Sequence, residues 1–288
     1  MRKATLLLVV MFLITLLVGC SEVSEEMLKE GVIEEEIEKM PKEEIIKKEV
    51  FEMKLNKTSA TLVTVYDNYE HDPKLRTGFG FGCIVKTDDK TILFDTGSDS
   101  ETLLFNMEKM KIKPKEIDIV VLSHIHGDHV GGLTGFLERN SNVKVYIPTS
   151  FPDSFKDAVK SAGAEVINVS KAVEICNGVG TTGELGTWIK EQSLIVNTNK
   201  GMVVITGCAH PGIVHIVETA KKITGKKIYL VLGGFHLGGA SDAVLKGIIS
   251  SFRKLGVEKA APCHCSGGCL LYTSPSPRDL STSRMPSS

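Results

Sequence analysis

The sequence predicts an α/β fold, and three observations favour it. From Ala60 to Gly268, short runs of β-branched and apolar residues alternate with stretches that have helical spacing. No linker-like break divides this stretch, so we expect a single domain of catalytic size. The chain has 288 residues, of which 42% are hydrophobic, and this is enough to bury a sizeable core.

The first half of the domain is predicted to begin with strands. Residues 61–67 have a strand pattern, and residues 82–97 predict a hairpin that turns at residues 88–90. A helix is expected next, because four apolar residues follow at helical spacing: Leu103, Leu104, Met107 and Met110. Residues 117–123 are nearly all apolar, which is typical of a strand that is buried on both faces.

The second half is predicted to repeat this alternation. The expected strands are residues 143–148, 164–169, 192–198, 201–207, 227–234 and 259–265. The expected helices are residues 154–162, 213–223 and 242–255.

The N-terminal segment is predicted to be a signal rather than part of the core. Charged residues at the start are followed by an apolar stretch and then by Gly19 and Cys20. The Leu-Val-Gly-Cys ending resembles the lipobox of bacterial lipoproteins, in which the cysteine carries the lipid. An uncleaved membrane anchor is the alternative. We therefore expect residues 1–20 to be a lipoprotein-type signal peptide. The folded part would then lie outside the cytoplasm, anchored to the membrane through a lipid on Cys20.

The segments on either side of the predicted domain have unusual compositions. Residues 21–57 are dominated by Glu and Lys and predict a charged tether, with a partner-binding acidic helix as the alternative. Residues 269–288 begin with CLLYTSPSPRD, which resembles a translated sequencing adapter, so we expect this tail not to be native. The domain itself is expected to span residues 58–268 and to lack part of its C-terminal end.

Charge and cysteine content exclude two classes of protein. The net charge of −1 argues against an extended nucleic-acid surface, since proteins that follow phosphates carry a basic excess. The chain has seven cysteines, but Cys20 and Cys269 lie in the signal and in the tail. The other five are an odd number in a chain with a sizeable core, which disfavours a disulfide framework.

Histidines gather where the predicted strands end. Six of the eight follow strands: His124, His126, His129, His210, His236 and His264. In open α/β folds, ligands and catalytic groups meet at the edge beyond the carboxyl ends of the strands. A polar loop with satisfied histidines is the alternative, but such a cluster of unpaired imidazoles would be costly to bury.

The stretch SHIHGDHVGG has the spacing of a metal site. In an irregular loop, His124 and His126 can point the same way and bind one cation. Asp128 and His129 can serve a second cation nearby. The glycines of the stretch allow the backbone turns that such convergence requires: Gly127, Gly131 and Gly132.

These residues resemble a known family. SHIHGDHVGG is similar to the His-x-His-x-Asp-His signature of the metallo-β-lactamase-fold hydrolases, and ILFDTG, TGCAHPG and PCHCSG match further motifs in the same order. The resemblance implies a four-layered αβ/βα sandwich with the metals at one edge. It also implies that Asp95, in ILFDTG, orients the site rather than binding metal.

His236 departs from the family pattern. Most members carry at this strand end an aspartate that bridges two metals, and an imidazole cannot bridge in that way. The motifs around His236 are similar to one branch of the family, which is related to the archaeal dihydropterin ribofuranosylaminobenzene phosphate synthase.

The resemblance implies a role for each candidate site residue. His124, His126 and His210 would hold a first metal, and Asp128, His129 and His264 a second, with His236 beside or between them. Asp128 is also the candidate catalytic base, because it can orient the attacking water instead. One or two divalent cations are expected. Zinc suits the ligands, and iron or manganese also fits. Cys208, Cys263 and Cys265 lack the spacing of structural zinc ligands and are interpreted as packing or supporting residues.

The leading functional hypothesis is hydrolysis, by metal-activated water, of a small-molecule ester, lactone or phosphoester. A pterin-type transferase is the alternative within enzymes, although an exported chain argues against an intracellular pathway. A non-catalytic metal-binding or ligand-binding lipoprotein is the third. We expect a small-molecule substrate and no nucleic-acid partner, and the sequence leaves the oligomeric state open.

Overall fold

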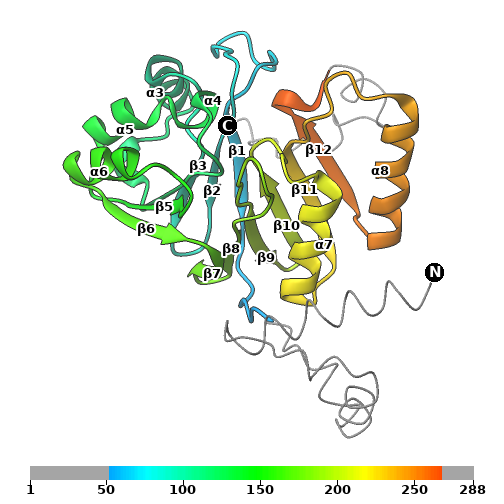
Figure 1. Ribbon diagram of the computed structural model, residues 1–288. Helices are drawn as coiled ribbons and strands as arrows, with labels where there is room; N and C mark the ends of the chain where they lie inside the picture. The colour runs from blue at the N-terminus through cyan, green and yellow to red at the C-terminus, as the bar shows by residue number, and fades with distance from the viewer. Residues whose placement is uncertain (1–51, 268–288) are drawn as a thin grey trace, which may run out of the picture. The chain divides into compact units, whose positions relative to one another are not determined.

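The computed structural model describes residues 52–267, which form two β-sheets with helices on their outer faces (Figure 1). The predicted signal peptide, Cys20, nearly all of the tether and the C-terminal tail lie outside the described residues, so those expectations stay predictions. Among the described residues, no helix combines the length and the apolar character that crossing a membrane requires.

The first sheet is formed by the N-terminal half of the domain. Its strands lie in chain order: β1 (Thr61–Tyr66), β2 (Gly82–Lys86), β3 (Thr91–Phe94), β4 (Ile119–Val121), β5 (Lys144–Pro148) and β6 (Glu165–Val169). The first three strands are antiparallel, and the pairs from β3 to β6 are parallel. Its helices are α3 (Ser100–Lys109), α4 (Gly127–Val130), α5 (Leu133–Arg139) and α6 (Asp153–Ser161).

The second sheet has the same mixture of pairings. Its strands are β7 (Lys171–Cys176), β8 (Val179–Gly183), β9 (Leu194–Thr198), β10 (Gly201–Thr206), β11 (Ile228–Gly234) and β12 (Lys259–Cys263). Strands β7 to β10 are antiparallel, whereas β10, β11 and β12 are parallel. The helices α7 (Ile213–Thr224) and α8 (Asp242–Leu255) each end at a glycine in the left-handed conformation, as helix ends often do.

Three apolar layers hold these elements together. One lies between the first sheet and its helices, and another lies between the second sheet and its helices. The third lies between the sheets, where Phe81 and Phe94 of one half meet Leu194 and Ile205 of the other. Helix, sheet, sheet and helix therefore follow one another, which confirms the expected four-layered α/β sandwich (Figure 1).

A buried polar residue also links the two sheets. Gln192 donates from Nε2 to the carbonyl oxygens of Leu122 and Tyr146, which belong to the first half. Its Oε1 accepts from Thr181 of β8 at 2.7 Å. Because a buried amide without partners is costly, these bonds favour one relative placement of the sheets.

Most predicted elements are present, but the chain also has elements that were not predicted. Helices α4 and α5 are two of them. Residues 171–183 form the β7–β8 hairpin, which was not predicted although Asn177-Gly178 lies at its turn. The folded part also begins before residue 58, since Met53 and Leu55 are 5% and 7% exposed. The backbone N–H of Met53 donates to Ile223 in α7, so the end of the predicted tether packs against the second sheet's helix layer.

Candidate metal centre

The predicted ligands meet at one edge of the sandwich because of how the strands end. His124 and His126 follow β4, and Asp128 and His129 lie in α4 directly after them. His210 follows β10, and the histidines at 236 and 264 follow β11 and β12. The part of SHIHGDHVGG that carries His124 and His126 is an irregular loop, as predicted, but a helix follows it from Gly127. His126 is the N-cap of α4, so one helical turn presents Asp128 and His129.

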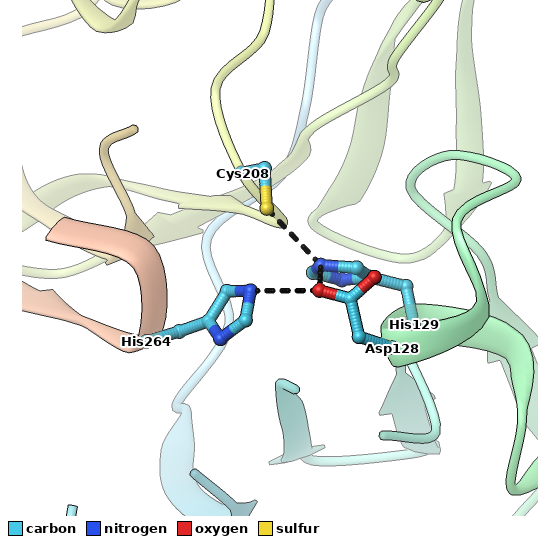
Figure 2. A group of neighbouring side chains, drawn as sticks. All are labelled: Asp128, His129, Cys208 and His264. Atoms are coloured by element: carbon cyan, nitrogen blue, oxygen red, sulfur yellow. Dashed lines mark hydrogen bonds and ion pairs between the residues drawn. The ribbon is translucent and has the colours of Figure 1, made fainter. Parts of the chain in front are cut away.

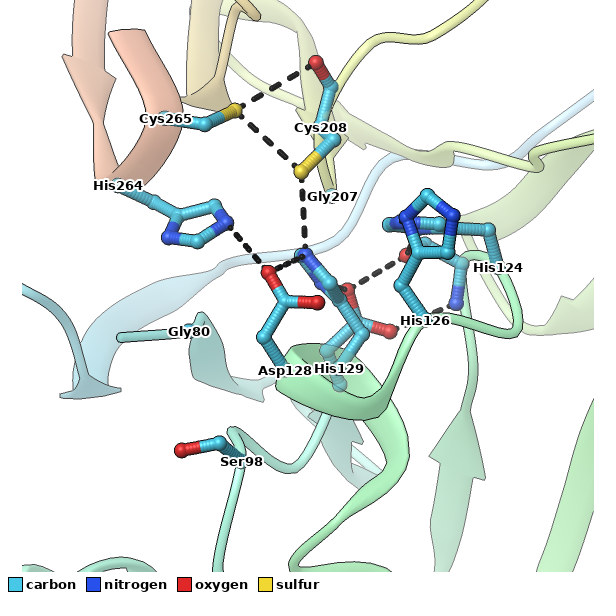
Figure 3. A network of polar contacts seen from close by, with 12 residues as sticks. Gly80, Ser98, His124, His126, Asp128, His129, Gly207, Cys208, His264 and Cys265 are labelled. Carbon is cyan, nitrogen blue, oxygen red and sulfur yellow. Dashed lines mark hydrogen bonds and ion pairs between the residues drawn. The ribbon is translucent and has the colours of Figure 1, made fainter. Parts of the chain in front are cut away.

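Three histidines form a first group of potential ligands. One ring nitrogen from each of His124, His126 and His210 lies within 4.8 Å of the others. His124 Nε2 and His126 Nδ1 are 3.1 Å apart (Figure 3). Burial lowers the pKa of His124, and the neighbouring imidazoles lower it further. The ring therefore stays neutral, which is the form that binds a cation.

A carboxylate, two imidazoles and a thiol form a second group: Asp128, His129, Cys208 and His264 (Figure 2). Asp128 Oδ2 lies 3.4 Å from His129 Nε2 and 3.2 Å from His264 Nε2. The thiol of Cys208 lies 3.2 Å from His129 Nε2. Burial raises the pKa of Asp128, but the contacts with His129 and His264 outweigh it and lower that pKa below its usual range.

The donor atoms fit divalent metals. His210 Nε2 is buried and has no hydrogen-bond partner among the described residues. His264 Nε2 is also buried, and its 3.2 Å contact with Asp128 Oδ2 lacks the alignment of a hydrogen bond. A buried polar atom without a partner is costly, and a cation at each group would supply one. Imidazole, carboxylate and thiolate donors together suit zinc and related divalent metals.

Asp95 orients one imidazole ring of each ligand group, His129 directly and His124 through Ser123. Its Oδ2 accepts from His129 Nδ1 at 2.7 Å and from the hydroxyl of Ser123 at 2.6 Å. Ser123 Oγ is in turn 2.9 Å from His124 Nδ1, and Asp95 Oδ1 accepts from the backbone N–H of Ser123. Burial lowers the pKa of His129, but the carboxylates of Asp95 and Asp128 outweigh it and raise it to about 10. The predicted orienting position of Asp95 agrees with this geometry.

His264 is positioned by residues that the sequence analysis did not identify. Its Nδ1 lies 2.9 Å from Asn68 Oδ1, and its backbone N–H donates to Asp67 Oδ1 at 3.1 Å. Asn68 also donates to the backbone oxygen of His264. Both residues follow β1, and no motif or spacing connects them with a histidine almost two hundred positions later.

Glu191 organises the loop that carries Cys208 and His210. Its Oε1 accepts from the hydroxyl of Thr206 and from the backbone N–H groups of Gly207, Cys208 and Ala209. Its Oε2 accepts from the backbone N–H of His210 at 2.9 Å. The side chain is 1% exposed. Glu191 was not predicted, and its position in a charged, loop-like stretch gave no signal.

His236 lies beside two cysteines, and its ring also lies next to that of His210, with the ring centroids 4.6 Å apart. Its ring nitrogen and the sulfurs of Cys208 and Cys265 all lie within 4.8 Å of one another. The two sulfurs are 3.3 Å apart (Figure 3). The hydrogen bond to Cys208, helped by the nearby His264, lowers the pKa of the Cys265 thiol to about 6. The sequence analysis left His236 beside or between the two metals, and a position next to the two cysteines agrees with the first of these.

Two glycines of the SHIHGDHVGG stretch allow close packing of the backbone rather than a turn. Gly131 and Gly132 have ordinary helical φ angles, and both donate to the carbonyl oxygen of Gly97. A Cβ at Gly131 would lie 2.0 Å from the oxygen of Ser98, and one at Gly132 would lie 2.2 Å from that of Thr96. These contacts let α4 pack directly on the loop after β3.

Strained backbone is concentrated around the same edge. Among the described residues, five other than glycine have positive φ angles, and four of them lie here: Asp95, Ala209, His236 and His264. Such angles cost roughly 1–3 kcal/mol each and cluster where side chains are held for binding.

Comparisons with known proteins agree with this geometry. A family model, the metallo-beta-lactamase superfamily, matches residues 77–222, which include Asp95, the SHIHGDHVGG stretch and His210. A 7,8-dihydropterin-6-methyl-4-(beta-D-ribofuranosyl)-aminobenzene-5'-phosphate synthase from Methanocaldococcus jannaschii is 32% identical over 254 residues. The alignment covers 72% of this chain and 86% of that protein.

Two further relatives cover different shares of the chain. A ribonuclease Z from Pediococcus pentosaceus is 31% identical over 111 residues, which are 36% of this chain and 33% of that protein. The crystal structure of a metal-dependent hydrolase of the beta-lactamase superfamily is similar with a TM-score of 0.60 and 27% identity. That similarity covers 74% of this chain and 91% of the other. The chain therefore belongs to the metallo-β-lactamase superfamily, whose fold usually binds divalent metals.

Proposed function

We propose that this protein is a metal-dependent synthase that joins a dihydropterin to a ribofuranosyl-aminobenzene phosphate or to a closely related aromatic phosphate. The observation that carries the proposal is the relative from M. jannaschii, which is named as such a synthase and is similar over 86% of its length. The sequence analysis favoured hydrolysis and kept a pterin-type transferase as the alternative. The similarity now favours that alternative.

The two ligand groups suit such a reaction because they are adjacent. The rings of His124 and His129, one from each group, have centroids 4.2 Å apart. Divalent cations held there would polarise phosphoryl or carbonyl oxygens and lower the pKa of a bound nucleophile. The carboxylate of Asp128 is positioned between His129 and His264, where it can hold a cation or accept a proton.

An exposed aromatic ring lies beside these groups. Phe79 is 63% exposed, and its ring centroid is 5.0 Å from that of His264. An exposed ring offers a stacking surface for a flat aromatic substrate. Pterin and aminobenzene rings both have that shape, so Phe79 supports an aromatic rather than an aliphatic substrate.

The direct test is a coupling assay with the full chain. The protein is incubated with a dihydropterin that carries a leaving group on its 6-methyl carbon and with ribofuranosyl-aminobenzene phosphate. Mass spectrometry then measures the joined product. We expect product that disappears on chelation, and a higher KM in Phe79→Ala than in the control Phe105→Ala. Absence of joined product with either metal-loaded or metal-free protein would contradict the proposal.

Hydrolysis is the second candidate, and the structural similarity to a metal-dependent hydrolase favours it. In hydrolysis, water would replace the aminobenzene compound as the acceptor at the candidate metal centre. Hydrolysis is measured with lactone, ester and phosphoester substrates, using the same protein preparations as in the coupling assay. Turnover on such a panel without any coupling would replace the synthase by the hydrolase, and turnover that survives chelation would exclude both.

A substitution of Asp128 separates its two predicted roles. We expect Asp128→Asn to bind one cation instead of two. Asp128 Oδ2 is as close to the ring nitrogens of His129 and His264 as the ligand atoms of one metal ion are to each other. Metal analysis and turnover are measured together. A full metal content with lost turnover would instead assign Asp128 to proton transfer.

A further inference from the structure

We propose that Cys208, His236 and Cys265 form a third metal site, which binds one thiophilic cation of the zinc type beside the two imidazole groups. This goes beyond the proposed function, which needs only those two groups. Cys208 also lies within reach of the second group, and the proposal assigns its sulfur to the third site, which leaves Asp128, His129 and His264 for the second cation. It also gives His236, which departs from the family pattern, a role of its own.

The three side chains come from the ends of three neighbouring strands. Cys208 follows β10, His236 follows β11, and Cys265 follows β12. These strands are paired in parallel, so their carboxyl ends lie side by side at the edge where the imidazoles meet. The ligand atoms lie within 4.8 Å of one another, and both cysteines are free thiols.

The distance between the sulfurs favours a cation over a disulfide. Two thiolates bound to one tetrahedral zinc at about 2.3 Å lie about 3.8 Å apart. A disulfide requires about 2.0 Å. The sulfurs of Cys208 and Cys265 are 3.3 Å apart. They would have to move only slightly apart to bind one zinc, but much closer together to form a disulfide.

The backbone around these side chains is shaped to bring them together. A Cβ at Gly234 would lie 2.7 Å from the sulfur of Cys265, so glycine leaves the space that this sulfur occupies. His236 itself has a φ of 52°, and Ala209, directly after Cys208, has a φ of 59°. Two residues other than glycine are thus held in a strained conformation at the ligands, which is typical of binding sites.

The donor atoms of the three side chains indicate which cation the site would bind. Two thiolates and one imidazole prefer zinc or copper(I) to magnesium, calcium or manganese. Three protein ligands leave one coordination position, as in zinc sites that bind a water or a substrate. His236 is exposed, so that position is accessible from solvent.

The test is cobalt binding to the full chain after reduction and removal of metal. Sulfur-to-cobalt charge-transfer absorption reports thiolate ligation, and elemental analysis gives the count. We expect three equivalents with strong absorption in the unsubstituted protein and in the control Cys176→Ser. Cys265→Ser and His236→Ala should each bind one equivalent fewer, and Cys265→Ser should lose at least half of the absorption.

A second measurement covers the case in which a variant fails to fold. In the unsubstituted protein, cadmium should protect Cys208 and Cys265, but not Cys176, from alkylation mapped by mass spectrometry. Equal counts and equal absorption in the unsubstituted protein and Cys265→Ser would overturn the proposal. So would alkylation of Cys265 that cadmium does not slow, or a Cys208–Cys265 disulfide in place of the sulfur-to-cobalt absorption.

Discussion

Asp95 is the residue through which the two imidazole groups are connected. It is fully buried, and it contacts His129 directly and His124 through the hydroxyl of Ser123. Fixing the second nitrogen of a metal-binding imidazole selects its tautomer and its orientation. One carboxylate thus sets two rings, which explains why the structure tolerates a positive φ at this position.

Asp95→Asn should weaken metal binding without unfolding the chain. An amide has a single oxygen, so its NH₂ group faces either the backbone N–H of Ser123 or the donors of His129 and the Ser123 hydroxyl, and the rings are less well oriented. We expect the affinity of the second group to fall by about 10–100-fold. Competition with a chelator measures the affinity, and Asp157→Asn on exposed α6 is the control. Equal affinity in the two variants would show that Asp95 does not orient the site.

Among single residues, the candidate metal ligands are easier to predict from the sequence than the residues that hold them in place by hydrogen bonds. The histidines could be predicted because apolar strands precede them and the strand ends share an edge. Asn68 and Glu191 could not, because their partners are mostly backbone groups that only the folded chain brings near them. Backbone partners leave no pattern in the side chains.

The two glycines that follow helix α4 pack against the loop after β3. We expect Gly131→Ala to lower the free energy of unfolding by about 1–3 kcal/mol, because the added methyl group overpacks the contact with Ser98. Gly127→Ala is a matched control in the same motif, since nothing lies within 4 Å of its Cβ. Urea unfolding compares the two, and equal stability would contradict the close-approach explanation.

The loop after β10 depends on Glu191. In Glu191→Gln, an NH₂ group replaces one of the two carboxylate oxygens. It then faces backbone N–H groups that donate to that oxygen in the unsubstituted protein. Hydrogen bonds to charged groups contribute about 1.5–3 kcal/mol, so we expect a loss of that size in the free energy of unfolding. Glu108→Gln, on the exposed face of α3, is the control. A loss no larger than that of the control would mean that other contacts hold the loop.

The order of strands and helices was largely predictable, because each strand has its own apolar run. The β7–β8 hairpin was not, since Lys171–Cys176 has no continuous apolar run and none of its residues is buried. Helix α4 is only four residues long, and its sequence, GDHV, has no helical periodicity. Tertiary contacts rather than local propensity stabilise both elements.

Across the whole molecule, the two sheets contribute different parts of one centre. The first half supplies the SHIHGDHVGG stretch and Asp95, and the second supplies His210, His236 and His264. The core between the sheets and the bonds of Gln192 fix how these halves face each other. Neither half alone carries a complete imidazole group, because His124 and His126 come from the first half and His210 from the second, and Asp128 and His129 from the first and His264 from the second.

The metal content of the protein tests this account most directly. Elemental analysis is made on the full chain carrying Cys265→Ser, so that the proposed third site does not contribute. We predict two divalent cations per chain, one for each imidazole group, and loss of one in His124→Ala. A count of one or none in protein that is folded and saturated with metal would contradict the account.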